Sequence, residues 1–178
     1  IEDATLPPLG FVDDELEALV LGLRDVAAIA DPALAKAATS ALAKIQARVP
    51  PKQAHRLKHA VLDARRYRNP EQPRIDVAAL RQAAWDEVSV RFAYRDGKGD
   101  MTKRAVKPLG IVFIDDTNML LAWCHLRQDF RTFRLDRMDD LSVTQDSFRP
   151  HRVSLLRDHL AHLRKQDTRR AEDCAAPN

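Results

Sequence analysis

The 178-residue chain is poor in cysteine, with only Cys124 and Cys174, and this excludes a secreted fold held together by several disulfides. It has no apolar run near the ~18 residues that a membrane span needs, and its first residues, Ile1 to Ala4, carry no basic leader. These absences predict a soluble, cytoplasmic protein without a membrane partner. Because the sequence starts with Ile rather than Met, we expect it to be a fragment of a longer protein.

Net charge is also low, at +3, but its distribution along the chain is uneven. Residues 1–50 carry 4 basic and 8 acidic residues, whereas residues 51–75 carry 7 and 2. Of the 29 Lys and Arg residues, 21 are Arg, whose planar guanidinium binds phosphates and carboxylates through paired hydrogen bonds. The sequence therefore favours an anionic partner, and pairing of these arginines with surface acids is the structural alternative.

The first part of the chain has the periodicity of helices. Residues 13–30 begin with acidic side chains and then repeat apolar residues every three or four positions, which predicts an amphipathic helix. A second helix is predicted from Pro32, with Asp31 as its N-cap, up to a pair of prolines. Residues 52–66 are basic and compatible with a third helix, and the proline-containing stretch after them is typical of a linker.

Further along, the pattern changes to the alternation of strands. A short helix at 77–87 is followed by predicted strands at about 88–94, 102–114, 118–126, 131–138 and 141–145, and by a helix at about 154–165. Pro108 and Gly110 mark a bulge or an edge position. The sequence thus predicts an α+β chain: a helical linker or dimerisation segment over 1–70, a small bent antiparallel sheet or barrel over 71–150, and a C-terminal helix with a disordered tail over 151–178.

Common enzyme signatures are missing. The chain has no Gly-rich phosphate loop, serine nucleophile elbow or HExxH motif, so we predict no enzyme, no cofactor and no bound metal. His55 and His59 have a metal-ligand spacing, but the basic residues beside them would repel a cation, and a solvated basic face fits better. His159 and His162 are interpreted in the same way. Cys124 is predicted to be a small buried hydrophobe.

One segment, DFRTFRLDRM at residues 129–138, is unusually rich in arginine. It places Arg131, Arg134 and Arg137 within seven positions. On a strand, Arg131 and Arg137 would share one face with the apolar residues, and Arg134 would project from the other.

Two interpretations of this segment stay open. Neighbouring strands could add Arg104, Lys107, Arg91 or Arg95, with Tyr94 and Trp123 as stacking platforms, a combination that binds single-stranded nucleic acids. Alternatively, the aspartates in and beside the segment would tie its arginines into a structural lattice of salt bridges.

At these residues the sequence resembles a known family. The stretches LPPLGFVDDELEALVLGLRDVA and LAKAATSALAKIQARVP are similar to the helical segment that precedes the WYL domain in bacterial transcriptional regulators. The stretches VSVRFAYRDGKGDMTKRAVKPLGIVF and LLAWCHLRQDFRTFRLDRM, with a closing SF, are similar to the WYL core itself. The chain therefore resembles WYL-domain regulators of the DeoR-like helix-turn-helix group.

This resemblance implies an Sm-like, SH3-type small barrel that senses an effector and signals to an N-terminal helix-turn-helix domain. The implied partners are a single-stranded nucleic acid or a phosphorylated small molecule, a second copy in a homodimer, and promoter DNA through a helix-turn-helix that this sequence lacks. Carried over by position, the basic pocket residues would be Arg104, Arg131, Arg134 and Arg137, and His125 would occupy a position that is often polar.

The sequence departs from the family pattern at its naming motif. The tripeptide falls at Asn118-Met119-Leu120, so only the Leu is retained and the ligand could differ. The competing function is a dimerisation and scaffolding module, in which the helices within residues 13–48 self-associate and the arginine cluster is structural.

Overall fold

The computed structural model describes residues 10–50, 73–114 and 117–175. The chain divides into two compact units, residues 1–69 and residues 70–178, which we call the helical unit and the sheet unit. The helix expected at 52–66, with His55 and His59, lies outside the described residues. None of the helices within the described ranges combines the length and apolar character that a membrane span requires.

The helical unit contains α1 (Asp13–Ile29) and α2 (Pro32–Arg48), as the periodicity predicts. The predicted cap is confirmed, because the Asp31 carboxylate accepts hydrogen bonds from two backbone N–H groups in the first turn of α2. The two helices pack against each other through a small apolar cluster made by Leu16, Val20, Leu42, Ile45 and Val49. Part of the apolar surface that self-association would use is thus engaged within the chain.

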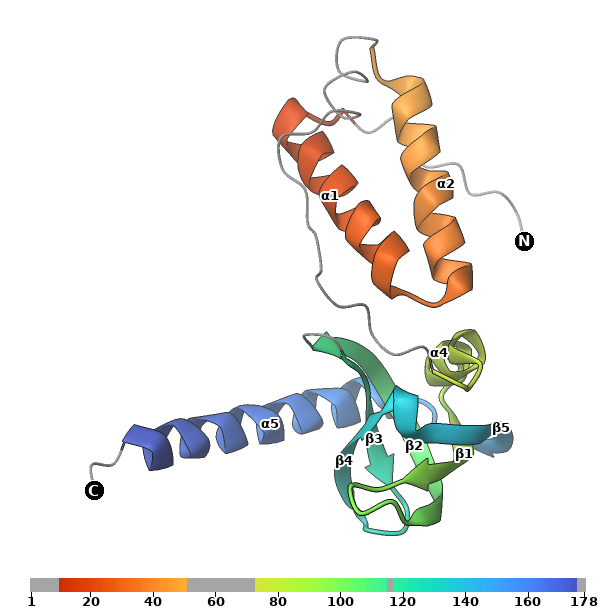
Figure 1. The fold of residues 1–178 in the computed structure, drawn as a ribbon, viewed down its shortest axis with the longest axis vertical. Helices are drawn as coiled ribbons and strands as arrows, with labels where there is room; N and C mark the ends of the chain where they lie inside the picture. The colour runs from red at the N-terminus through yellow and green to blue at the C-terminus, as the bar shows by residue number, and fades with distance from the viewer. Residues whose placement is uncertain (1–9, 51–72, 115–116, 176–178) are drawn as a thin grey trace. The chain divides into compact units, whose positions relative to one another are not determined.

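The sheet unit has one sheet flanked by two helices (Figure 1). Its elements are α4 (Val77–Asp86), β1 (Val88–Arg95), β2 (Met101–Ile114), β3 (Thr117–Cys124), β4 (Asp129–Arg134), the 3₁₀ turn η1 (Leu135–Arg137), β5 (Met138–Ser147) and α5 (Arg152–Ala175). The strands are antiparallel in the order β4-β3-β2-β1-β5. The α+β class is confirmed. The sheet is open, since the edge strands β4 and β5 are not paired, and a closed barrel is not confirmed.

The open sheet is nevertheless strongly curved. Two strands, β2 and β3, separate β1 from β4, so a flat sheet would hold β1 and β4 about 14 Å apart. Instead, the Tyr94 hydroxyl on β1 accepts a hydrogen bond from the backbone N–H of Arg134 on β4, at 3.4 Å. The ring of Phe133 meets those of Phe92 and Tyr94 edge to face, with centroids 5.3 and 5.1 Å apart. These aromatic contacts bring β1 and β4 together across the concave face.

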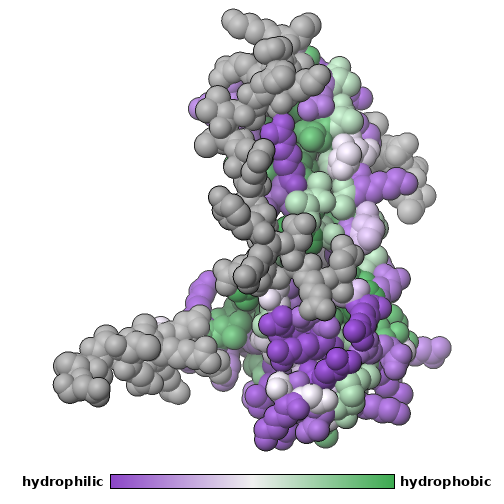
Figure 2. Space-filling model, viewed as in Figure 1, coloured by the Kyte–Doolittle hydropathy of each residue, from purple (hydrophilic) through white to green (hydrophobic). Residues whose placement is uncertain are grey.

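The hydrophobic core fills this concave side. α4 begins at Val77, directly after its N-cap Asp76, whose carboxylate accepts a hydrogen bond from the backbone N–H of Ala79 at 2.9 Å. The helix buries Leu80 completely. From the sheet and from η1 come other fully or nearly fully buried side chains, including Val90, Phe92, Val106, Leu120, Phe133, Leu135 and Met138. Hydrophilic residues cover much of the sheet unit on the face seen in Figure 2.

Local details agree with the sequence in some places and differ in others. The bulge is confirmed, because the β2–β3 register shifts between Pro108 and Gly110. The strand predicted over 131–138 is too long: β4 ends at Arg134, and η1 turns the chain while burying Leu135 completely. α5 continues to Ala175, beyond its predicted end, because this stretch is rich in good helix formers.

Replacing Leu120 by Ala should lower the free energy of unfolding of the sheet unit by about 2–5 kcal/mol, because a fully buried side chain leaves a cavity. Urea unfolding followed by tryptophan fluorescence measures this, since Trp85 and Trp123, the chain's two tryptophans, both belong to this unit. The control is Val143→Ala on β5, where the side chain is 49% exposed and the loss should be small. Equal losses for the two variants would contradict this core.

Candidate functional site

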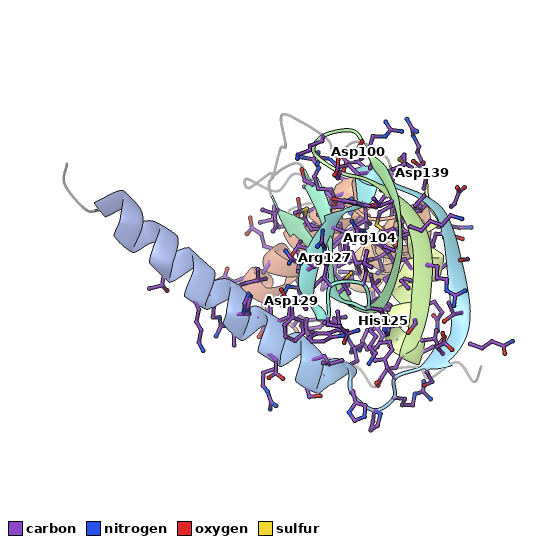
Figure 3. The ribbon with its side chains drawn as sticks, turned by 90° about the horizontal axis from the view of Figure 1, so that it is seen from below. Asp100, Arg104, His125, Arg127, Asp129 and Asp139 are labelled. Carbon is purple, nitrogen blue, oxygen red and sulfur yellow. The ribbon has the colours of Figure 1, made fainter. Side chains whose placement is uncertain are left out.

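A pocket of about 500 Å³ lies where the ends of β1 and β3 approach β2, β4 and the β3–β4 turn. Its walls combine the guanidinium groups of Arg104, Arg127 and Arg131 with the aromatic rings of Tyr94 and Phe133. The remaining lining side chains are the hydroxyl of Thr132, the thiol of Cys124 and the carboxylate of Asp96. Figure 3 shows Arg104 and Arg127 close together within the curve of the strands. The volume is in the range of pockets that hold a small ligand, about 300–1,000 Å³.

The β1–β2 hairpin positions Arg104. The residue lies on β2 opposite Phe92 of β1, and the tight turn after β1 sets this register. In that turn the Asp96 carboxylate accepts hydrogen bonds from the backbone N–H groups of Lys98 and Asp100, at 2.8 and 3.0 Å. Those bonds hold the pKa of Asp96 below its ordinary value of 3.8. The one carboxylate of the pocket lining is therefore ionised and already bound to the turn.

The β3–β4 hairpin supplies the other arginines. Arg131 lies on β4 opposite Ala122 of β3, and Arg127 lies in the intervening turn. The backbone N–H of His125 donates to the Ala105 carbonyl at 3.0 Å, which ties the start of this turn to β2. The curvature of the sheet then directs both hairpins to the same space.

The pocket arginines differ in how well their charges are already satisfied. The Nε of Arg104 is buried and has no hydrogen-bond acceptor among the described residues. Within the same part of the chain, neither Arg104 nor Arg127 forms an ion pair. Arg131 approaches Asp129 at 3.4 Å, but both side chains are about half exposed, at 53% and 45%, so the pair is weak and open to exchange. The lining thus holds excess positive charge suited to an anion.

Arg134 has a different environment from the pocket arginines. Its Nε and Nη2 both donate to the Asp136 carboxylate, at 3.0 and 2.6 Å, in the paired geometry typical of Arg and carboxylate. This hydrogen bonding, which outweighs desolvation, holds the pKa of Asp136 below 3.8. Arg137 lies in η1 and, like Arg134, is outside the pocket lining.

Trp123 and His125 also lie outside the lining. Successive strand residues point to opposite faces, so Trp123 turns away from the side on which its neighbour Cys124 meets the pocket. Its ring packs edge to face on Phe130, with centroids 5.0 Å apart. His125 is exposed in the turn after β3, and desolvation followed by the charge of Lys107 lowers the pKa of its imidazole from 6.5.

Of the sequence-predicted residues, the structure brings Tyr94, Arg104 and Arg131 together in one pocket. Cys124 is buried, as predicted, at 1% exposure, and it also lines this pocket. The sequence reasoning missed Arg127. The available signal was its place in the short HLRQ turn directly before the arginine-rich strand, since residues at strand ends commonly surround a ligand site.

No group of three or more metal-ligating side chains occurs in the described ranges. The arrangement instead offers charge-assisted hydrogen bonds from several guanidinium groups, together with an aromatic wall, to a ligand that bears phosphate or carboxylate oxygens.

Comparison with known proteins identifies proteins to which this chain is similar. Residues 76–143, which cover α4 and the sheet as far as the middle of β5, match the WYL domain family. The chain is 28% identical over 144 residues to the uncharacterized HTH-type transcriptional regulator YobV of Bacillus subtilis, covering 76% of this chain and 44% of that protein. A similar solved structure is proteasome accessory factor B/C (PafBC) of Arthrobacter aurescens, with a TM-score of 0.39 and 23% identity, covering 82% of this chain and 22% of that one. The chain therefore spans less than half the length of either protein.

The Arg134–Asp136 pair predicts a specific pH dependence. Because the pKa of Asp136 is lowered on folding, its ionised form stabilises the fold above pH 3.8, and this contribution is lost as the pH falls through the lower folded-state pKa. The parent should thus be more stable than Asp136→Asn at neutral pH, with the difference shrinking toward pH 3. Urea unfolding between pH 7 and pH 3 measures this, with the exposed Asp140→Asn as control. A difference that stays constant over this range would contradict the ion pair.

Proposed function

Because this chain carries a WYL domain and is similar to an HTH-type transcriptional regulator, we propose that it is the effector-sensing module of such a regulator. The effector is an anion with phosphate groups, bound in the pocket by Arg104, Arg127 and Arg131. Binding there is transmitted to a promoter-binding helix-turn-helix domain outside this sequence. The module adopts the Sm-like, SH3-type version of the curved five-stranded sheet and acts within a homodimer.

The observation that carries this proposal is Arg104, which lines the pocket and whose buried Nε has no acceptor among the described residues. Desolvating a cationic donor without pairing it costs free energy, and a structural salt-bridge lattice would have supplied a carboxylate. The Arg134–Asp136 pair is an example of such a structural bridge in the same strand region. Arg104 is thus better explained by an acceptor on a ligand.

Size and surroundings favour a ligand, or a portion of one, with about the bulk of a nucleotide. A pocket of about 500 Å³ can accept one phosphate-bearing unit with its attached ring, beside Tyr94 and Phe133. A single-stranded nucleic acid could place one nucleotide there while its other phosphates contact exposed basic residues. A phosphorylated small molecule could fill the same space alone, so single-stranded nucleic acid is the first candidate and the small molecule the second.

The test is a fluorescence-anisotropy titration with labelled single-stranded DNA and RNA at two salt concentrations, with a duplex as control. Saturable binding should prefer single strands and weaken with salt, since released counterions make affinity fall steeply. Replacing Arg104 by Ala should weaken binding by about 10- to 100-fold, the effect of losing charged hydrogen bonds, and reduce the salt slope by about 0.7 for one phosphate contact.

Two further variants sharpen this result. Arg91→Ala removes an exposed guanidinium on β1 that is outside the lining, so the affinity should change little. Arg134→Ala should mainly reduce stability through loss of the Asp136 pair. If no oligonucleotide binds, pyrophosphate is titrated and followed by thermal shift. Failure of both ligands, or equal effects of Arg104→Ala and Arg91→Ala, would refute the proposal.

A further inference from the structure

α5 is held on the sheet through an aromatic stack. The helix contacts β2 and β3 and places Leu156 beside Gly110 of β2. His159, in the middle of the docked part of α5, is only 1% exposed. Its imidazole stacks on Phe130 of β4, with centroids 5.0 Å apart and planes 18° from parallel, and Phe130 in turn packs on Trp123 of β3.

The buried imidazole is poorly equipped to carry a charge. Its Nδ1 is enclosed and has no hydrogen-bond partner among the described residues. A protonated imidazole carries a positive charge and an N–H at Nδ1, and both would be desolvated at this enclosed position. The charged or titratable groups that act on it are His162 on α5, which opposes protonation, and Asp129 on β4, which favours it. Asp129 is already shared with Arg131, at 3.4 Å.

We propose that α5 is a pH-dependent clamp on the Trp123–Phe130 pair, and that protonation of His159 releases it. Phe130 lies between Asp129 and Arg131 on β4, so release frees the strand end that borders the pocket. The clamp depends only on contacts outside the pocket lining, and it stands whether or not an anion binds in the pocket.

The direction of the pH effect follows from where the proton binds more tightly. Burial, the largest cause, and then His162 lower the pKa of docked His159 below 6.5, while an undocked imidazole returns toward that value. The released state therefore binds more protons. The equilibrium constant for docking of α5 is therefore largest above about pH 6.5. Between the pKa of the released imidazole and that of the docked imidazole, it falls by up to about tenfold per pH unit as the pH is lowered.

The experiment follows Trp123 fluorescence in the whole chain carrying Trp85→Phe, which leaves one tryptophan and keeps an aromatic ring beneath the Arg152 guanidinium. Between pH 7.5 and pH 5.0 the emission should move to longer wavelength as α5 leaves Phe130 and water reaches the indole that packs on this ring. His159→Phe keeps a stacking ring without a titratable proton and should abolish the shift. His151→Gln, which removes an exposed histidine one position before α5, should leave it intact.

A second measurement uses the unmodified chain, so its result does not depend on whether a variant folds. In the unmodified chain, amide hydrogen exchange corrected for its intrinsic pH dependence should show residues 152–163 losing protection at pH 5.5 while β1 keeps its protection. Absence of this selective loss, or a fluorescence shift that persists in folded His159→Phe, would overturn the proposal.

Discussion

The contact between Phe133 and the rings of Phe92 and Tyr94 is the constraint on which the candidate site depends. It joins strands that are separated by two others in the sheet and so fixes the curvature. Only in a curved sheet do a residue of the first hairpin, Arg104, and residues of the second, Arg127 and Arg131, border one pocket. The aromatic cluster thereby keeps the guanidinium groups of the pocket close together despite their mutual repulsion.

The arginines near this pocket divide into two classes by their partners. Arg134 is committed to Asp136 by two hydrogen bonds, so it stabilises the turn that ends β4. Arg104 has a buried Nε with no acceptor in the described part of the protein. A guanidinium bound to a neighbouring carboxylate has little left to offer a ligand, whereas one without an acceptor gains a hydrogen bond when a phosphate arrives. The two interpretations that the sequence leaves open thus apply to different arginines.

Local signals in the sequence predict most of the elements. Apolar periodicity and the Asp31 and Asp76 caps are enough for α1, α2 and α4, and alternation is enough for β1. The candidate site is harder to predict from the sequence, because the alternation argument treats residues 129–138 as one continuous strand. The turn at η1 breaks that alternation and removes Arg137 from the face predicted for it. Whether Arg127 or Trp123 lines the pocket is decided by the curvature of the whole sheet, and a local sequence pattern does not predict that curvature.

The most direct test of the anion pocket observes the Arg104 side chain itself. Two-dimensional ¹H–¹⁵N NMR of the arginine Nε–H groups, assigned by comparison with Arg104→Lys, can follow a titration with a short single-stranded oligonucleotide and then with pyrophosphate. We predict that the Arg104 Nε–H signal shifts downfield and saturates as it gains an acceptor, while that of exposed Arg91 moves little. An Arg104 signal that remains unchanged throughout both titrations, or that moves no more than the Arg91 signal, would contradict the assignment of this pocket as an anion site.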